Sequence, residues 1–422
     1  MASSSKGSKK KRWRSQVIVG GEERTIDRLS DLPDGVLHHI LSFLDTKCAV
    51  RTSLVSKRWR FLWRDVPALN FSRSVCKRTA FAEYIRNLLS LRSNDAPVAS
   101  ITFNFVYSWM VQPDMHLFDR IMKYAADSRR NGGHGLDHLS IAHAVCEIRF
   151  GMLAASIAAH HRESIKTLKV TKSDLDSGSG FGLGFSFLTA LELRGCWLYT
   201  GREKLPVDPF AGLPCLNYLK LFNCSATSLV FKITGPQLLD FQIQKESHTS
   251  EKIEVFAPKL KSFRYSGFIT ELVKLSAPSL DWADIRIWWD PMKIEELELH
   301  CKYMKLLGEL HNAKSLCLRF ADIYDKSGPP KSREEQLSRL TSTPKIWEED
   351  EFPLTSMKSL MESEASPFTR LKTLRVQYPQ APPKTPCEVI NYFFERSPHR
   401  VGGKSVKFEK RKQMMKQRWL YV

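Results

Sequence analysis

Between residues 27 and 71, apolar residues recur three and four positions apart, which is the spacing of an amphipathic helix. The clearest stripe consists of Val36, Leu37, Ile40, Leu41 and Leu44. Pro33 suits the first position of a helix, and Asp34 favours the positive end of the helix dipole. The pattern therefore predicts a helix that begins near Pro33 and runs to about Leu44.

Two further short helices are predicted before residue 71. Thr46 can cap the second helix, and the apolar residues of the two helices are Ala49, Val50, Leu54, Val55, Trp59, Leu62 and Trp63. So small a helical unit buries too little surface to be stable alone. Either it packs on the rest of the chain or it offers its apolar stripe to another protein, and periodicity leaves both alternatives open.

A second pattern, apolar-x-x-apolar-x-apolar, recurs along the rest of the chain. Its copies are Val98-Ile101-Phe103, Leu136-Leu139-Ile141, Ile165-Leu168-Val170, Leu188-Leu191-Leu193, Leu216-Leu219-Leu221, Leu238-Phe241-Ile243, Leu260-Phe263-Tyr265, Ile294-Leu297-Leu299 and Leu371-Leu374-Val376. Most central positions between 139 and 263 lie 22 to 29 residues apart, which is near the leucine-rich-repeat period. Residues 72–321 are therefore predicted to form a degenerate leucine-rich-repeat solenoid, an α/β fold of parallel strands with helical or irregular returns.

Two copies of the repeat carry a cysteine three residues after the last leucine. These are Cys196 and Cys224, at the position where the repeat places a buried Asn or Cys. Their expected role is structural.

The residues between the leucines are expected to face the concave surface of the solenoid. These positions are Glu192, Arg194, Tyr218, Lys220, Phe222, Gln242, Arg264, Glu298, His300, Arg319, Arg375 and Gln377. The candidates for ligand contact among them are Arg194, Tyr218, Lys220, Phe222, Gln242, Arg264, His300, Arg319 and Arg375. Their mixed chemistry suits a protein or composite ligand better than a uniform polyanion, and an ordinary solvated sheet face is the alternative.

The ends of the chain differ from this body. Residues 1–25 are predicted to be a disordered basic tail and residues 322–366 a flexible insertion rich in Pro, Gly and charge. Residues 367–396 resume the repeat and end in a predicted helix from Glu388 to Arg396, and residues 397–422 are predicted to be a basic C-terminal tail.

The net charge of +19 raises the question of nucleic-acid binding. Residues 1–14 carry six Lys or Arg and no acid, and residues 396–422 carry nine against Glu409, so the two ends hold 14 of the 19 charges. Terminal arms supply only salt-sensitive attraction, whereas a nucleic-acid groove needs a folded basic face. A basic nucleic-acid-associated nuclear protein therefore remains the alternative. The run Lys9–Arg14 is either a nuclear-import signal or a solubilising arm, so we expect the nucleus, the cytoplasm or both.

No local motif for catalysis, cofactor or metal binding emerges from the sequence. The glycines at 178, 180, 182 and 184 miss the phosphate-loop spacing, and no elbow of the G-x-S-x-G type or H-E-x-x-H pair is present. His134, His138, His143 and Cys146 have metal-ligand residue types but unsuitable placement. We therefore expect no enzyme, no cofactor and no metal.

The nine cysteines without a CxxC pair indicate free thiols in a reducing compartment. The longest apolar stretch, Phe150 to Ala159, is too short to span a membrane.

The N-terminal helical pattern resembles the F-box in its plant form. The residues that carry the resemblance are Asp27-Arg28-Leu29-Ser30-Asp31-Leu32-Pro33, Leu37, Ile40-Leu41-Ser42-Phe43-Leu44, Ala49-Val50, Leu54-Val55-Ser56-Lys57-Arg58-Trp59-Arg60 and Leu62-Trp63. Residues 26–71 are thus predicted to be an F-box, with Cys48 standing where similar sequences usually place a charged or polar residue. The C-terminal repeat also resembles, more loosely, the FBD region of plant F-box leucine-rich proteins.

The resemblance implies an adaptor of a Skp–cullin–F-box ubiquitin ligase rather than an enzyme. It implies that the Skp-type subunit is bound by Leu32, Pro33, Leu37, Ile40, Leu41 and Leu44, with Val50, Leu54 and Trp59 in the interface or packed behind it. The repeats would then hold an unknown substrate protein at the concave candidates. An enzyme with a site invisible to local motifs is the third hypothesis.

Overall fold

The structure is a computed structural model that describes residues 29, 31–72, 78–93, 96–105, 115–130, 135–143, 150–176, 185–199, 208–226, 230–245, 252–267, 273–289, 296–322, 368–378 and 405–410. Several predicted features lie outside these described residues: the basic run Lys9–Arg14, the glycines 178–184, His134 and Cys146, most of the insertion and the helix predicted from Glu388 to Arg396.

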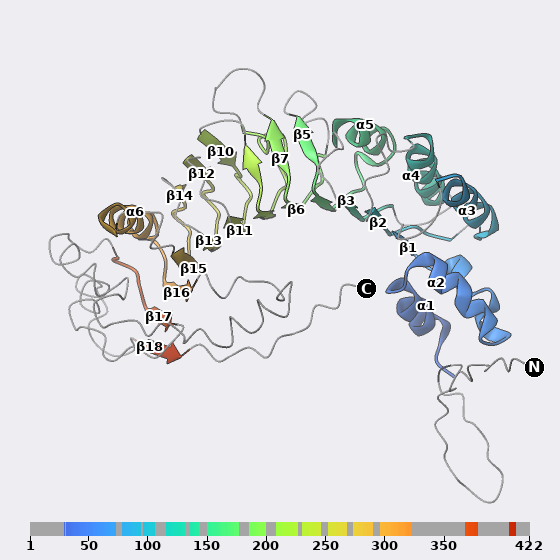
Figure 1. Cartoon of the computed structure of the whole chain (residues 1–422), viewed down its shortest axis with the longest axis horizontal. Coiled ribbons are helices and arrows are strands. Elements are labelled where there is room, and N and C mark those ends of the chain that lie inside the picture. The colour runs from blue at the N-terminus through green and yellow to red at the C-terminus, as the bar shows by residue number, and fades with distance from the viewer. Residues whose placement is uncertain are drawn as a thin grey trace, which may run out of the picture.

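One parallel sheet runs through the body as the inner layer of an arc (Figure 1). In spatial order its twelve described strands are β1 (Ala68–Ser72), β2 (Ser100–Phe105), β3 (His138–His143), β4 (Thr167–Thr171), β6 (Ala190–Arg194), β8 (Tyr218–Phe222), β11 (Asp240–Lys245), β13 (Ser262–Gly267), β15 (Trp282–Trp289), β16 (Ser315–Asp322), β17 (Thr373–Tyr378) and β18 (Ser405–Lys410). Each strand pairs with the strand of the next repeat, which is the arrangement of a solenoid.

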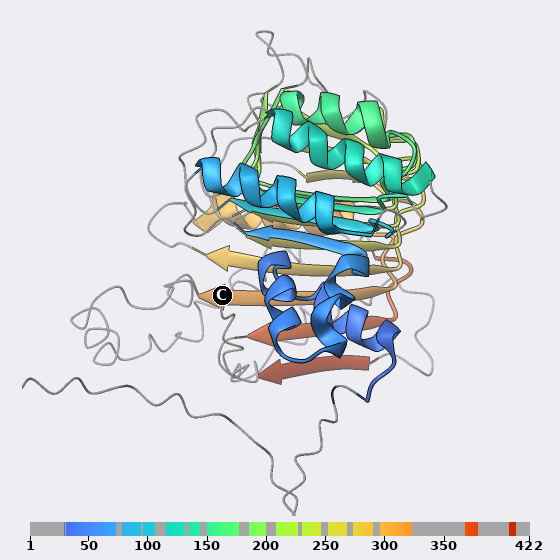
Figure 2. The same cartoon turned by 90° about the vertical axis from the view of Figure 1, so that its right-hand side faces the viewer.

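A second layer covers the convex side of the sheet. It begins with the helices α3 (Arg78–Leu91), α4 (Met115–Arg130) and α5 (Phe150–His161), which lie side by side in Figure 2. It continues with two sheets of short strands, β5 (Asp174–Asp176), β7 (Trp197–Tyr199) and β9 (Ser225–Ala226), then β10 (Val230–Thr234), β12 (Lys252–Phe256) and β14 (Val273–Ser276), and with the helix α6 (Glu296–Glu309). The predicted α/β repeat solenoid is confirmed.

The core lies between these layers, and the leucines of the repeat supply it. In β6 the side chains of Leu191 and Leu193 are buried, whereas Glu192 between them is only half-buried. Because the strands pair in register, Leu191 stands beside Leu168 and Leu219, and the apolar positions form continuous rows. The first apolar position of the apolar-x-x-apolar-x-apolar pattern therefore lies in a buried turn before the strand. The other two positions point into the core from a strand whose alternate residues face the concave surface.

Backbone turns at the ends of three successive strands repeat the same conformation. Lys172, Gly195 and Asn223 have φ values of 52°, 57° and 52°, in the left-handed region. The amide N–H of each donates to a carbonyl of the next repeat, at 2.7 to 2.8 Å. This turn directs the following residue inward, which buries Ser173, Cys196 and Cys224 at equivalent positions.

The N-terminal helical unit, which we define as residues 31–66, consists of short elements. They are α1 (Asp34–Ser42), α2 (Thr46–Arg51) and the single 3-10 turns η1 (Thr52–Leu54), η2 (Arg58–Arg60) and η3 (Leu62–Asp65). The prediction that Thr46 caps α2 is wrong: Asp45 is the cap, because its carboxylate accepts from Lys47 N at 2.9 Å. The Thr46 hydroxyl instead accepts from Asn70 N at 2.8 Å.

Asn70 on β1 joins this helical unit to the sheet. Its side-chain Nδ2 donates to the carbonyl oxygens of Ser42 and Leu44, each at 2.8 Å, and Ser72 N donates to Asp45 Oδ2 at 2.9 Å. The unit therefore covers the otherwise open edge of β1 and pairs the backbone N–H groups of Asn70 and Ser72 there. Its buried residues also belong to the same core cluster as those of β1 and α3.

One predicted copy of the repeat is wrong. Leu297 and Leu299 lie in a helix rather than a strand, because Glu296–Glu309 form α6, in which Tyr303, Met304 and Leu307 are buried at helical spacing; Ile294 lies outside the described residues. Glu298 and His300 therefore lie on a convex-side helix and are withdrawn from the concave candidates.

No copy of the repeat was predicted for four strands of the sheet, although Arg319 of β16 was among the concave candidates. β1 was assigned to the helical unit although Val66, Leu69 and Phe71 fit the repeat phrase. In the repeat patterns that lead into β15 and β16, Ala283 and Ala313 stand at buried apolar positions. Their small side chains give a weaker apolar signal than leucine would. The prediction that 397–422 is only a tail is also wrong, because β18 pairs with β17. Val406 and Phe408 alternate with charged residues, which is a strand pattern, but the many basic residues of this segment indicated a tail instead.

The phase of the strands gives a direct test. Leu193→Asp places a carboxylate in the packed core without a partner and should lower the free energy of unfolding by about 3–5 kcal/mol. Glu192→Ala removes only the partly exposed ion pairs with Lys169 and Arg194 and should cost about 1 kcal/mol or less. Thermal unfolding of both variants measures the difference, and equal melting temperatures would contradict the assigned phase.

The cysteines give a second test. Cys196, Cys224 and Cys317 are buried, whereas Cys48 and Cys215 are exposed. The pKa of the Cys196 thiol is raised by its hydrogen bond to Cys224 and by burial, so its reactive thiolate is disfavoured. Alkylation followed by peptide mass spectrometry should label Cys48 and Cys215 in the native protein, and Cys196 and Cys224 only after denaturation. Native labelling of Cys196 at the rate of Cys48 would contradict the placement.

Candidate interaction surfaces

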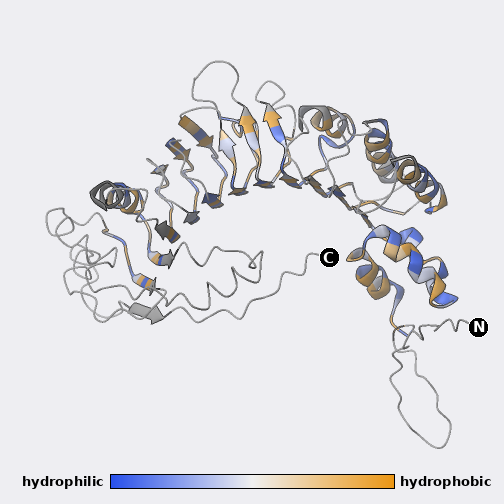
Figure 3. Ribbon diagram, in the orientation of Figure 1, coloured by the Kyte–Doolittle hydropathy of each residue, from blue (hydrophilic) through white to orange (hydrophobic). Residues whose placement is uncertain are grey.

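Helix α1 carries two neighbouring apolar stripes. Leu37 and Leu41 are buried and Leu44 packs against them. One step around the helix lie Val36, Ile40 and Phe43, preceded at the same spacing by Pro33. Val36 is 43% exposed and Phe43 is 74% exposed. We call Pro33, Val36, Ile40 and Phe43 the outer stripe; α1 is accordingly coloured as largely hydrophobic in Figure 3 although only its inner side is buried.

The predicted Skp-facing residues fall into two groups. Pro33 and Leu54 are exposed, and Leu32, Ile40, Leu44 and Val50 are half-buried. Leu37, Leu41 and Trp59 are buried in the core of the chain. In this chain Leu37, Leu41 and Trp59 pack behind the surface, and the contact of any of the nine residues with a Skp-type subunit stays a prediction.

Exposed apolar side chains concentrate on the helical unit. Six of the eleven large exposed hydrophobic residues in the described part of the chain lie there or directly before it: Leu29, Val36, Phe43, Leu54, Val55 and Phe61. A unit this small leaves so much apolar surface in water at a cost, which is typical of a docking surface. Phe43, Val55 and Phe61 were absent from the predicted contact set. They could have been found as apolar residues that lie next to the core-facing stripe instead of within it.

Arg58 fixes the start of the outer stripe. Its Nη2 donates to the carbonyl oxygen of Leu32 and, at 2.9 Å, to Asp34 Oδ1. These contacts join the turn before α1 to η2, which lies far along the sequence. Arg58 therefore holds the Leu32-Pro33 turn against the unit. The sequence marked this arginine only through the family resemblance.

The concave face of the sheet is the second candidate surface. Eight of the nine predicted ligand contacts lie on it: Arg194, Tyr218, Lys220, Phe222, Gln242, Arg264, Arg319 and Arg375. Each is exposed or half-buried beside buried neighbours of the same strand. The exception is His300, on α6.

Charge on this face begins at β4. From β4 to β17 the described side chains include seven Lys or Arg against three carboxylates; the cations are Lys169, Arg194, Lys220, Arg264, Arg286, Arg319 and Arg375, and the acids are Glu192, Asp240 and Asp284. In the first half, Glu192 pairs with both Lys169 and Arg194. The Arg194 guanidinium also lies 3.9 Å from the centroid of the Phe222 ring.

In the second half of the face, arginines surround one carboxylate. Arg319 Nη2 lies 3.0 Å from Asp284 Oδ2, and Arg264 Nη2 lies 3.7 Å from Asp240 Oδ2. Burial raises the pKa of the Asp284 carboxyl, against the opposing charges of Arg319, Arg286 and Arg264. Asp240, Asp284 and Arg286 were not predicted, because β15 was not recognised and Asp240 is the first residue of its strand.

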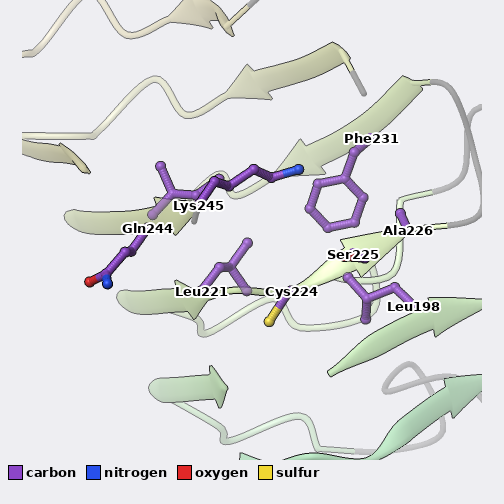
Figure 4. Close-up of a pocket in the computed structure, with 9 residues that line it drawn as sticks. Leu198, Leu221, Cys224, Ser225, Ala226, Phe231, Gln244 and Lys245 are labelled. Carbon is purple, nitrogen blue, oxygen red and sulfur yellow. The ribbon is translucent and has the colours of Figure 1, made fainter. Parts of the chain in front are cut away.

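A small cavity lies in the core between the sheet and the convex strands, and Figure 4 shows its lining. Leu198, Leu221, Cys224 and Phe231 form its walls, and the buried Lys245 side chain extends toward Phe231. It is mostly apolar and offers few converging polar groups, so it is a packing defect rather than a ligand site.

The described residues contain no cluster of three or more His, Cys, Asp or Glu with metal-binding geometry. None of the described helices combines the length and apolar composition that a membrane crossing requires.

Comparisons with known proteins agree with this architecture. Residues 29–71 match the F-box domain. The chain is 27% identical to F-box/LRR-repeat protein At5g02910 of Arabidopsis thaliana over 72% of this chain and 62% of that protein. It is 54% identical to Putative F-box/LRR-repeat protein At3g18150 over 70% and 60%, and 27% identical to F-box/FBD/LRR-repeat protein At5g56420 over 72% and 68%, both from the same plant. The chain spans 52% to 62% of the length of the first three such relatives.

The helical unit and the solenoid together define an F-box protein with a leucine-rich-repeat body. The chain is similar to plant F-box/LRR-repeat proteins along both of these parts, which confirms the resemblance noted in the sequence.

The junction between the two surfaces can be tested at Asn70. Asn70→Ala removes two hydrogen bonds to the carbonyl oxygens of Ser42 and Leu44 and leaves these acceptors without their donor. It should lower the free energy of unfolding by about 1–3 kcal/mol. The matched control is Asn87→Ala, on the exposed side of α3, which should cause no loss. Denaturant titration measures both, and an equal effect of the two changes would contradict the junction.

Proposed function

We propose that this chain is a substrate-recruiting adaptor of a Skp–cullin–F-box ubiquitin ligase. The F-box binds a Skp-type subunit and, through it, a cullin, and the concave face of the solenoid binds a substrate protein that becomes ubiquitinated. The observation that carries the proposal is the outer stripe: a matched F-box domain exposes Pro33, Val36 and Phe43 on one side of α1, outside its own core.

The chemistry of the outer stripe supports helix docking in an apolar groove. Phe43 offers a large aromatic anchor, and His39 packs against it edge to face with ring centroids 4.8 Å apart. Pro33 presets the backbone that enters α1. Burial of exposed anchors such as Phe43 and Val36 in a partner is the usual source of affinity at such interfaces.

The attachment of the F-box supports the recruiting role. Because the F-box shares its core with β1 and α3 and closes the β1 edge, a partner on α1 and a ligand on the concave face are held at a fixed separation. An adaptor of this kind raises the effective concentration of the substrate near an enzyme held elsewhere. No group of this chain then needs to take part in chemistry.

The proposal is tested at two residues of the outer stripe. Val36→Ala with Phe43→Ala removes two exposed side chains, so the melting temperature should change little. Affinity for a Skp-type protein should fall by roughly 10- to 100-fold or more, because each buried anchor contributes about 1.5–3 kcal/mol. Isothermal titration calorimetry with the purified full chain measures this change.

Phe187→Ala is the matched control, since Phe187 is 53% exposed but lies in the solenoid, before β6. It should bind the Skp-type protein as the wild type does. If the wild-type chain fails to bind, or if the double variant binds with unchanged affinity, the proposed interface is wrong. Retention of the wild-type chain on nucleic acid with steep salt dependence would favour the alternative of a nucleic-acid-associated protein.

A further inference from the structure

The edge of the main sheet at which the strands begin carries a line of charged side chains. This edge lies at the tails of the arrows in Figure 2. The residues directly before β13, β15, β16 and β17 are Lys261, Asp281, Lys314 and Lys372. From Asp281 onward, each donates its backbone N–H to the carbonyl oxygen of the one before it, at 2.8 to 3.0 Å. The backbone therefore holds these four residues in a line, about 4.8 Å apart.

Two further cations lie in the turns that enter these strands. Lys259 and Arg370 each stand two residues before a member of the line, with a buried leucine between the two positions. The corresponding turn positions before β15 and β16 are the uncharged Ser279 and Asn312. We call the five cations of these two rows the basic rim: Lys259, Lys261, Lys314, Arg370 and Lys372.

Asp281 is the one carboxylate in the two rows. Lys314 Nζ lies 2.6 Å from Asp281 Oδ1. The hydrogen bond from Lys314 lowers the pKa of the Asp281 carboxyl, and the charges of Lys261 and Arg370 lower it further. Three members of the basic rim thus surround a single carboxylate.

The remaining contacts of the basic rim are with neutral groups or are absent. Lys259 Nζ donates to Gln237 Oε1 at 2.7 Å, and Arg370 Nη1 donates to the carbonyl oxygen of Pro278 at 3.3 Å. The amino groups of Lys261 and Lys372 have no hydrogen bond or ion pair with the described part of the chain. Five cations therefore meet one negative charge.

This excess is local, because the first part of the same edge is balanced. The residues before β3 and β4, Asp137 and Lys166, form an ion pair at 3.1 Å. Those before β6, β8 and β11 are Thr189, Asn217 and Leu239, which carry no charge. The positive charge on this edge thus begins with the turn into β13.

The basic rim is accessible to a ligand. Lys259, Lys261, Arg370 and Lys372 are exposed. The side chains of Lys314 and Asp281 are 42% and 44% exposed. A partner can therefore reach every charge of the rim without displacing a core residue.

We infer that the basic rim binds an acidic segment of a partner protein, with a short run of Asp or Glu side chains along the line of lysines. The line spans about 14 Å at the backbone, which an extended segment of about five residues covers. Alternate side chains of such a segment are about 6.8 Å apart, so two or three carboxylates can each meet a separate cation. The basic rim lies outside α1 and the concave face, so this inference goes beyond the proposed function and does not depend on it.

The composition of the rim favours carboxylates over phosphate groups. Phosphorylated motifs are usually read by clustered arginines, whose planar forks bind phosphate with two hydrogen bonds. Four of the five cations here are lysines, spread along a line. Proteins that bind single-stranded nucleic acid add aromatic rings on which bases stack, and no position of the two rows is aromatic. Asp281 would repel a phosphate backbone, whereas a peptide can donate a backbone N–H to its exposed carboxylate.

Fluorescence anisotropy of the full chain with a labelled oligoglutamate tests the inference. Lys261→Gln with Lys372→Gln should weaken binding roughly three- to tenfold, since two exposed charge pairs are lost. The melting temperature should not change, because neither amino group has a partner in the described part of the chain. Asp281→Asn should strengthen binding about two- to threefold, because it removes the repelling charge.

Lys232→Gln with Lys252→Gln is the matched control. Both lysines are exposed on the convex strands β10 and β12, and the change in net charge is the same. This control reports how much of the binding comes from the positive charge of the rest of the chain, and it should leave the affinity unchanged.

Carbodiimide coupling of the unlabelled oligoglutamate to the wild-type chain locates the contact. Peptide mass spectrometry should find the new amide bonds at Lys259, Lys261, Lys314 or Lys372 in preference to Lys232 and Lys252. Unchanged affinity of the rim variant, equal weakening by the control, or coupling confined to lysines outside the rim would overturn the inference. Tighter binding of a phosphoserine peptide or a single-stranded oligodeoxynucleotide that the rim variant abolishes would also overturn it, in favour of a phosphate ligand.

Discussion

Parallel backbone pairing between successive repeats is the constraint on which the rest of the molecule depends. Each strand of the main sheet hydrogen-bonds to the strand of the next repeat in one continuous register. The register places Leu191 and Leu193 in buried rows and the side chain of Glu192 in a row across the concave face. Any surface that this protein offers to a ligand there is a set of register partners, so its chemistry is decided residue by residue along a row rather than along the sequence.

A stack of this kind has two ends, and the F-box closes the first. Thr46 and Asp45 accept from the backbone N–H groups of Asn70 and Ser72 at the β1 edge, and the Asn70 side chain donates to carbonyl groups of the helical unit. The inner stripe of α1 adds to the same core. The sequence left open whether the helical unit packs on the chain or docks on another protein. The structure shows that α1 allows both: the inner stripe packs on the chain, and Val36 and Phe43 of the outer stripe are exposed to water.

The sequence predicted those strands whose core positions are occupied by large aliphatic residues. Large aliphatic residues at Leu188, Leu191 and Leu193 mark a strand clearly, whereas Ala283 and Ala313 bury too little to stand out. Ile294, Leu297 and Leu299 fit a strand phrase, yet the longer helical spacing through Leu307 prevails. On α1 both stripes are apolar, so periodicity could not tell Leu37 from Val36, and only the packing distinguishes the exposed stripe from the buried one. Charge neighbours across strands, such as Asp284 and Arg319, were invisible because register is a long-range property.

The number of residues between paired strands differs along the sheet, and this difference affects which strands unfold first. Register partners are 20 residues apart at Ser262 and Trp282 but 58 apart at Ser315 and Thr373. By loop-closure entropy, the longer interval costs about 1 kcal/mol more to close. In a solenoid whose units are held only by their neighbours, stability is a sum of local terms, so β17 and β18 are the first strands expected to detach. Opening of these two strands would remove Arg375 from the concave face and leave the F-box in place at β1.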